Sequence, residues 1–198
     1  MQKSKKKASE NKSMSGLILE PMFESNLKEP VRIILAGAAG QKVVSAGNLI
    51  ASAAALSGLW TTRRADFPVT IMTGFSVAEV IISPEPVLYS GIPRPDIVAL
   101  LAPAGRDKIK KRMQEMLSKD VVYFADGLGN VDTEAEQKPL AFPEAAKKDI
   151  RKNIAALTAG YLVKELDIFP FGALKEAVRQ VQKPKIAEIN LKVLTVYE

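Results

Sequence analysis

The hydrophobic and polar positions of the chain first fall into a regular pattern at Val31. Residues 31–37 form a run of β-branched and apolar side chains that ends in glycine, which is typical of a buried strand. Residues 42–57 carry apolar side chains at helical spacing, and Gly58 follows as a C-terminal cap. Leu59–Thr62 predicts a second strand. A strand, a glycine turn, a helix and a strand in this order form a βαβ unit, which predicts a parallel sheet.

A different pattern follows this unit. Residues 65–75 predict a loop, residues 76–83 predict a strand, and residues 82–91 (ISPEPVLYSG) predict a turn with a short second strand, so we expect a β-hairpin here. The α/β alternation then resumes, with strands predicted at 96–101 and 121–124 and helices at 103–117, 143–165, 171–182 and 185–196. We therefore expect an α/β fold of a single domain. Its sheet is mixed but mostly parallel, with helices on both faces and an inserted β-hairpin.

The N-terminal part of the chain differs from the rest in charge. Five lysines and one glutamate lie within residues 1–12, which leaves only +2 of the net charge of +6 for residues 13–198. We expect residues 1–15 to be a basic disordered tail, residues 16–30 an N-terminal extension, and residues 31–198 the α/β domain. A solvated tail is favoured over a nucleic-acid contact. We find neither a signal-peptide pattern nor an apolar run long enough for a membrane span, so we expect a cytoplasmic protein without membrane contact.

The composition excludes several kinds of chemistry. The chain contains no cysteine and no histidine, so it has no disulfide, no thiolate site for zinc or an iron–sulfur cluster, and no Ser-His-Asp or Cys-His machinery. The segment Asp126–Asp132 resembles a calcium loop superficially, but Leu128 stands at its third position, where a ligand is needed. We therefore predict no catalytic residue and no metal site on this chain. Redox or acid–base chemistry would come from a cofactor, a partner chain, or Asp, Glu, Lys and Tyr.

The glycine turn after the first strand is the main candidate site. Gly37, Gly40, Gln41 and Lys42 lead into a helix, whose free N–H groups and dipole favour a bound anion. The spacing matches neither GxGxxG nor a Walker A loop. Lys42 opposes the helix dipole at this position, so it gains most by facing an anion. The competing interpretation is a tight turn that only allows close packing of the helix on the sheet.

Two other hypotheses for the function of the chain remain open at this point. Arg63 and Arg64 follow the second strand, where an arginine can hold the 2′-phosphate of NADP in a freestanding nucleotide-binding domain. Alternatively, the chain is a non-catalytic interaction protein. The apolar loop Val69–Phe75 would be unusual on a free surface, which indicates that a partner covers it.

The order of these segments resembles a known family. Residues 31–50 (VRIILAGAAGQKVVSAGNLI) are similar to the opening of the gamma subunit of 2-oxoacid:ferredoxin (acceptor) oxidoreductases, the family that oxidises pyruvate, ketoisovalerate or 2-oxoglutarate, with its strand, G-x-G-G-Q-G turn and helix. Residues 67–83 hold the place of the family's Y-G-P-E-x-R-G-G-x-S loop and of the strand that follows it. The family's later strand and helices are matched by residues 95–100, 153–160, 171–178 and 187–192.

This resemblance implies a function shared with other chains. The family oxidises a 2-oxoacid to acyl-coenzyme A and carbon dioxide, with two electrons for ferredoxin. Thiamine diphosphate and iron–sulfur clusters would lie in partner chains, namely the alpha and beta subunits, with a delta subunit as a further candidate, and ferredoxin would be an indirect partner. The gamma chain would bind no cofactor alone, with coenzyme A as the candidate ligand of the assembled region.

The resemblance also implies which residues would meet that ligand. Gly37, Gly40, Gln41 and Lys42 would supply donors to an anionic group such as a coenzyme A phosphate, and the neighbouring loop (Thr73 and Gly74) would line the same edge. Two departures from the family pattern affect this region. The turn has Ala39 and Lys42 in place of glycines, and the loop has Thr70, Met72 and Thr73 in place of Glu, Arg and Gly, which makes it apolar. The Glu79–Ser83 strand and the Tyr89 to Asp96 spacing lean toward the 2-oxoglutarate branch.

Overall fold

A computed structural model describes residues 20–68, 73–144 and 150–198 of the chain. The basic tail and the loop residues 69–72 expected to be covered by a partner lie outside these residues. The strands are β1 (Val31–Ala38), β2 (Trp60–Asp66), β3 (Phe75–Ser83), β4 (Ile97–Leu100), β5 (Val121–Phe124) and β6 (Glu136–Pro139). The helices are α1 (Val43–Leu56), α2 (Pro103–Gln114), α3 (Ile150–Leu166), α4 (Phe171–Val181), α5 (Pro184–Leu194) and the short 3₁₀ helix η2 (Thr195–Tyr197).

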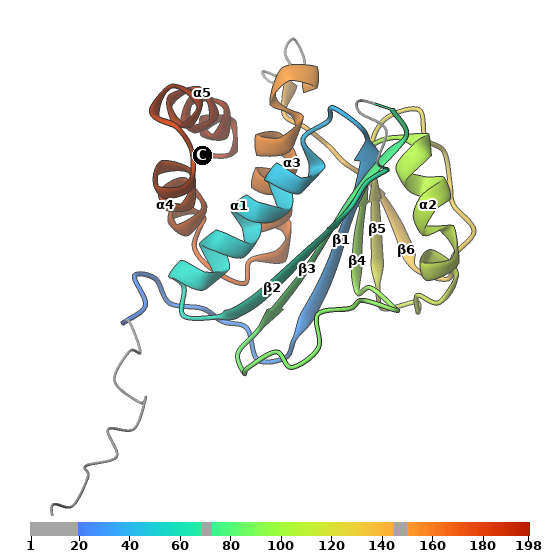
Figure 1. Cartoon of the computed structure of the whole chain (residues 1–198), viewed down its shortest axis with the longest axis horizontal. Helices are drawn as coiled ribbons and strands as arrows, with labels where there is room; N and C mark the ends of the chain where they lie inside the picture. Colours follow the sequence, from blue (N-terminus) through green and yellow to red (C-terminus); the bar gives the residue numbers. More distant parts are fainter. Residues whose placement is uncertain (1–19, 69–72, 145–149) are drawn as a thin grey trace, which may run out of the picture.

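The six described strands form one sheet in the order β2-β3-β1-β4-β5-β6. β1, β4, β5 and β6 are parallel, whereas β3 pairs antiparallel with both β1 and β2. β3 is thus the only described strand that runs against the others, and Figure 1 shows β2 and β6 at the two ends of the sheet. The expected mixed, mostly parallel sheet is confirmed.

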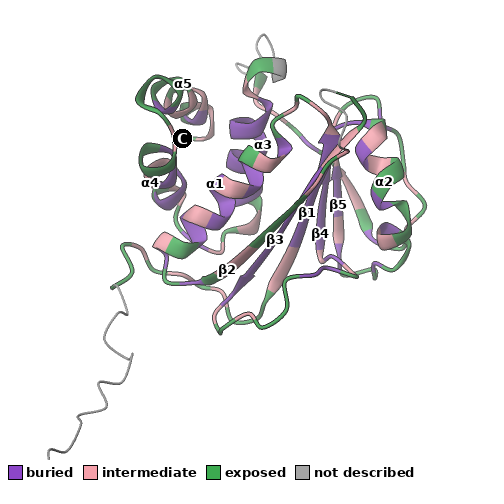
Figure 2. Cartoon of the chain, in the orientation of Figure 1, coloured by how far each residue is buried: buried purple, intermediate pink, exposed green. Residues whose placement is uncertain are grey.

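Helices cover both faces of the sheet, as expected. α1, α3, α4 and α5 lie on one face and α2 lies on the other (Figure 1). Two hydrophobic clusters fill the layers, because alternate residues of a strand point to opposite faces. On β1, Ile33 and Leu35 belong to the cluster under α1, while Ile34 and Ala36 belong to the cluster under α2. Figure 2 shows that the central strands β1 and β4 are buried along most of their length.

The N-terminal extension packs onto the body where the structure describes it. The N–H groups of Met22 and Phe23 donate to the carbonyl oxygen of Leu56 at the end of α1. Ser25 donates its hydroxyl to the carbonyl of Ile168 at 2.7 Å. Phe23 contacts the hydrophobic cluster, so this segment is joined to the body by both backbone and side-chain contacts.

The β-hairpin expected within residues 76–91 is not formed, and a different hairpin, made by β2 and β3, takes its place. Residues 84–91 form no strand in the structure, and β3 pairs instead with β2, which extends to Asp66. Pro84 and Pro86 cannot donate ladder hydrogen bonds, which disfavours a strand there. β2 was expected to end at Thr62, but it continues to Asp66, since an edge strand tolerates exposed polar residues.

Two smaller differences concern the last strand of the sheet and the end of α2. β6 (EQKP) has no apolar alternation and was missed, because a polar edge strand carries little pattern. The helix expected over 143–165 is described from Ile150 onward, and residues 145–149 of that prediction lie outside the described residues. Leu117, expected on the buried face of α2, follows the helix end and is exposed.

Candidate functional site

The glycine turn lies at a switch point of the sheet. β1 and β4 are parallel neighbours, and the helices that follow them, α1 and α2, pack on opposite faces (Figure 1). Connections that leave two adjacent strands toward opposite faces open a crevice outside the carboxyl ends of the strands, where α/β proteins bind their ligands. Residues 37–42 lie at the carboxyl end of β1, so topology and sequence point to the same edge of the sheet.

The turn is held in an unusual backbone conformation. Gly40 has φ of 86°, and Lys42, the residue before α1, has φ of 55° in the left-handed region. No side chain caps the N-terminus of α1, so the N–H groups of its first turn lack partners within the helix. These donors and the positive end of the helix dipole lie at the same edge of the sheet, an arrangement that suits an anion.

Gln41 clamps the turn rather than facing a ligand. Its Oε1 accepts a hydrogen bond from the N–H of Ala38 at 2.8 Å, and its Nε2 donates to the carbonyl oxygen of Leu101 at 3.2 Å. Leu101 lies between β4 and α2, so one side chain joins the two strand ends that frame the crevice. The side chain of Gln41 therefore acts as a positioning group in this structure.

Close packing fixes the floor of the crevice. A Cβ on Gly37 would stand 2.5 Å from Oε1 of Gln41 and 2.9 Å from Val43, so glycine is needed there. A Cβ on Gly105, in the first turn of α2, would overlap with the backbone of Ala36 and Gly37. The tight-packing interpretation of the turn thus holds for Gly37, whereas Gly40 faces open space. Sequence reasoning missed Gly105, although a glycine in the first turn of a helix could have indicated a close approach.

The loop residues Thr73 and Gly74 lie against the turn. The carbonyl oxygen of Gly74 accepts a hydrogen bond from the N–H of Ala39 at 2.9 Å, and both loop residues are exposed. Because Ala39 stands between Gly37 and Gly40, the six residues predicted for this site are brought together at one edge of the sheet.

A basic cavity adjoins the turn on the α1 side. Nζ of Lys42 lies 3.4 Å from the carbonyl oxygen of Lys152 on α3, which directs this lysine toward the cavity. The cavity measures about 400 Å³ and is lined by residues of the α1 start, α3, the end of α4, the α4–α5 connection and α5: Lys42, Ser45, Lys152, Asn153, Ala155, Ala156, Val181, Gln182, Lys183, Ile186 and Asn190. Three of these residues are lysines and none is acidic, so the cavity favours an anion.

The arginines of β2 lie elsewhere. In a dinucleotide-binding fold the second strand is the neighbour of the first, which brings its end near the glycine turn. Here β3 separates β2 from β1, and Nη1 of Arg63 donates to Oδ1 of Asn48 at 2.8 Å. The arrangement expected for an NADP phosphate is therefore not formed, and a freestanding NADP-binding domain is not favoured.

Groups with shifted pKa values lie away from the turn. The rings of Tyr123 on β5 and Tyr161 on α3 meet edge to face, with their centroids 5.5 Å apart. Burial raises the pKa of both phenols, and the negative charge of Glu165 raises both pKa values further. Burial also raises the pKa of Tyr197 in η2. Within residues 20–68, 73–144 and 150–198, no group of three or more acidic side chains could hold a metal ion, and no helix has the length and apolar character of a membrane span.

The fold is that of an α/β protein with a glycine turn at a switch point of its sheet, and comparisons with known proteins specify the class further. Residues 32–196 match the model of the family described as pyruvate ferredoxin/flavodoxin oxidoreductase. The chain is 27% identical over 177 residues to the 2-oxoglutarate synthase subunit KorC of Methanocaldococcus jannaschii, which covers 86% of this chain and 93% of that one.

Solved structures share the fold. The gamma subunit of a keto/oxoacid ferredoxin oxidoreductase from Geobacter sulfurreducens superposes with a TM-score of 0.64 at 20% identity, covering 84% of this chain and 95% of that one. The pyruvate oxidoreductase subunit PORC of Thermotoga maritima gives 0.63 at 16% identity, with coverages of 86% and 96%. A 2-oxoglutarate:ferredoxin oxidoreductase from Magnetococcus marinus gives 0.67 at 20% identity, and the match covers 86% of this chain but only 31% of that longer one.

The chain belongs to the pyruvate ferredoxin/flavodoxin oxidoreductase family, since the family model spans most of its length. The expected class, a gamma subunit of a multichain 2-oxoacid:ferredoxin oxidoreductase, is confirmed. Other subunits of such an enzyme are therefore its partners.

Proposed function

We propose that this subunit binds the phosphate-bearing part of coenzyme A in an oxidoreductase that converts a 2-oxoacid to acyl-coenzyme A. In this reaction the carboxylate of the 2-oxoacid leaves as carbon dioxide, the acyl group joins the thiol of coenzyme A, and two electrons pass to ferredoxin with release of a proton. The observation that supports coenzyme A binding most directly is the uncapped N-terminus of α1 beside a cavity with three lysines. The Magnetococcus marinus structure contains 2-oxoglutarate, coenzyme A and succinyl-coenzyme A.

The glycine turn and the cavity would each contact a different part of coenzyme A. Exposed Gly40 leaves room for a phosphate beside the first N–H groups of α1, because no atom lies within 4 Å of where its side chain would be. Lys42 lies between the turn and the cavity, so its ammonium can serve either part of a ligand that spans both. The exposed loop residues Thr73 and Gly74 border the same opening, and the clamp by Gln41 keeps it in place.

The remaining chemistry falls to other chains. The chain lacks the cysteine ligands of an iron–sulfur cluster, so we assign the clusters and thiamine diphosphate to the alpha and beta subunits, or to a delta subunit. Ferredoxin would then meet those chains and not this one. The similarity to a 2-oxoglutarate synthase subunit supports 2-oxoglutarate as the substrate over pyruvate. A cytoplasmic location stays a prediction.

The test is a charge reversal at Lys42 in the purified complex. We expect Lys42→Glu to raise the KM for coenzyme A at least tenfold and to leave the KM for the 2-oxoacid unchanged, measured as reduction of an electron acceptor. Lys110→Glu is the matched control, since Lys110 is an exposed lysine on α2. An unchanged KM for coenzyme A in the Lys42 variant would show that the phosphates bind elsewhere.

A further inference from the structure

The strand β2 forms an open edge of the sheet. It is the last strand in the sheet order, and β3 is its only partner strand within the described part of the chain. Its seven residues contain no proline, and Arg63, Arg64 and Ala65 are exposed. One side of its backbone pairs with β3, so alternate N–H and C=O groups on the other side point away from the sheet. An edge of this length can accept another strand.

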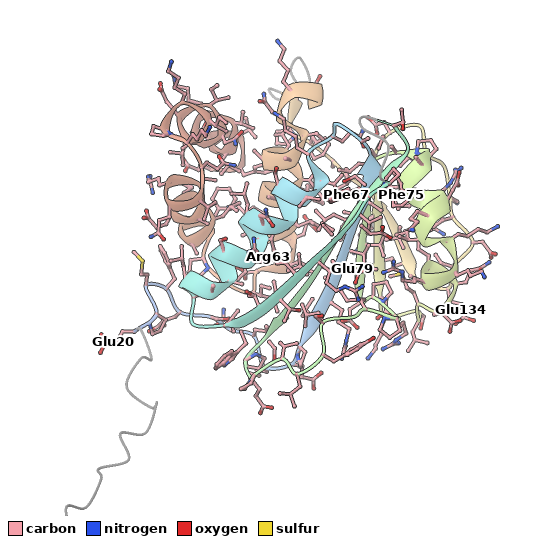
Figure 3. All side chains as sticks on the ribbon, in the orientation of Figure 1. Glu20, Arg63, Phe67, Phe75, Glu79 and Glu134 are labelled. Atoms are coloured by element: carbon pink, nitrogen blue, oxygen red, sulfur yellow. The ribbon has the colours of Figure 1, made fainter. Side chains whose placement is uncertain are left out.

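Aromatic side chains mark both ends of this edge. Trp60 begins β2 with 54% of its surface exposed, and Phe67 follows the strand with 63% exposed. Figure 3 places Phe67 at the hairpin end of the sheet and Arg63 midway along the strand. Large aromatic residues are enriched in interfaces between proteins, where their rings bury area at little cost in conformational entropy.

A cavity lies beside the edge on the α1 side. It measures about 260 Å³, and its wall includes Asn48 of α1 together with Arg63 of β2. α1 packs over both β3 and β2, and residues of this helix and of the two strands line the cavity. Gly47 brings the helix to within contact distance of Ala78 and Val80 of β3. A side chain from a strand added next to β2 would enter this space.

The charges on the edge select the kind of strand that fits. Arg63 bonds to Asn48 on the α1 face, and neighbouring residues of a strand alternate between faces, so Arg64 lies toward the α2 face. Pairing of β2 with a second copy in antiparallel register would set the arginines of the two copies near one another. Like charges opposite each other destabilise a sheet, so the edge disfavours self-pairing.

We propose that β2 accepts an extended, acidic segment of another subunit of the oxidoreductase complex, which adds a seventh strand to the sheet. Acidic side chains of this segment pair with Arg63 and Arg64, and apolar ones cover Trp60 and Phe67. The proposal rests on the chain being a subunit of such a complex, but not on the coenzyme A site, because β3 separates β2 from the glycine turn. Failure of the Lys42 experiment therefore leaves it intact.

Hydrogen exchange of the full chain, alone and within the purified complex, tests the pairing. In the free chain only alternate amides of Trp60–Asp66 are bonded to β3, so the others exchange quickly. We expect those amides to exchange at least tenfold more slowly in the complex. Equal exchange in the two states would overturn the proposal.

A double charge reversal tests the selected partner. We expect Arg63→Glu/Arg64→Glu to lower the affinity of the chain for the rest of the complex at least tenfold. Lys110→Glu/Lys111→Glu makes the same change of charge on exposed neighbours in α2 and should leave this affinity unchanged. Equal effects of the two double variants would overturn the acidic partner.

Measurements on the isolated chain test whether a second copy of the chain occupies the β2 edge instead. Trp60 is the only tryptophan, so its fluorescence reports burial of this edge. We expect emission and mass that do not change with protein concentration. A blue shift of the emission together with a dimeric mass would identify a second copy as the occupant and refute the proposed one.

Discussion

Substitution of Gly105 by alanine tests whether the end of β1 and the start of α2 are locked together. Gly105 is the third residue of α2, and a Cβ there would overlap with the backbone of Ala36 and Gly37. β1 is bonded to β3 on one side and to β4 on the other, so its backbone cannot move aside without loss of sheet hydrogen bonds. The helix has to move instead, and it carries buried contacts of its own.

Helix propensity and steric overlap predict opposite changes in the free energy of unfolding for this substitution. Alanine is favoured over glycine in a helix by about 1 kcal/mol. Overpacking of a well-packed core costs about 1–3 kcal/mol, and a clash with backbone belongs at the upper end of that range. We therefore expect Gly105→Ala to lower the free energy of unfolding by about 2 kcal/mol, which corresponds to a fall in Tm of roughly 4–8 °C for a chain of this size.

Urea unfolding of the full chain measures the change, and Gly172→Ala is the matched control. Gly172 is the second residue of α4, and a Cβ there would meet only the ring of Phe23, at 3.2 Å. We expect the control to be neutral or stabilised by up to about 1 kcal/mol. If Gly105→Ala were as stable as the wild type, the close approach of α2 to β1 would be refuted.

Three further substitutions test particular contacts of the fold. Gln41→Ala leaves the carbonyl of Leu101 without its donor and should lower the free energy of unfolding by about 1–3 kcal/mol, whereas an unchanged Tm would contradict the clamp. The Glu79 side chain is 8% exposed and pairs with Arg112 at 2.5 Å. Arg112→Met leaves this carboxylate buried without its partner, so it should lower the free energy of unfolding in urea by about 3 kcal/mol. Adding Glu79→Met to the same chain should restore most of that free energy. Burial raises the pKa of Tyr197 above its ordinary value of 10.0, so the stability that this phenol contributes is complete below pH 10 and is lost as the pH rises above that value. Between pH 9 and pH 11, the free energy of unfolding should fall less for Tyr197→Phe than for the wild type. Equal falls would refute the raised pKa of Tyr197.

Local patterns predicted the parts of the fold that are buried and continuous in sequence. β1, α1, α2 and β5 were recognised because burial on one or both faces leaves an apolar period in the sequence. The partner of β3 was assigned wrongly because strand pairing is decided by register between distant segments, which no local pattern encodes. β6 was missed because a polar edge strand needs no apolar residues.

The candidate site divides in the same way. The glycine turn was predicted because its residues are contiguous and lead into a helix. The clamp role of Gln41 was not predicted, because Leu101 lies 60 residues further along the chain. The steric role of Gly105 also depends on a strand far away in sequence. The cavity with three lysines could not be predicted from local pattern, because it combines residues of α1, α3, α4 and α5, which are far apart in sequence.

The position of β3 between β1 and β2 has a consequence for synthesis of the chain. β1 and β2 are translated first, yet in the finished sheet neither touches the other, and each pairs with β3. A nascent chain that ends before Phe75 therefore carries two strands without a native partner for either. Unpaired strands of this kind invite aggregation, so the ribosome-bound stage before β3 emerges is where a chaperone would have its greatest effect on the yield of this subunit.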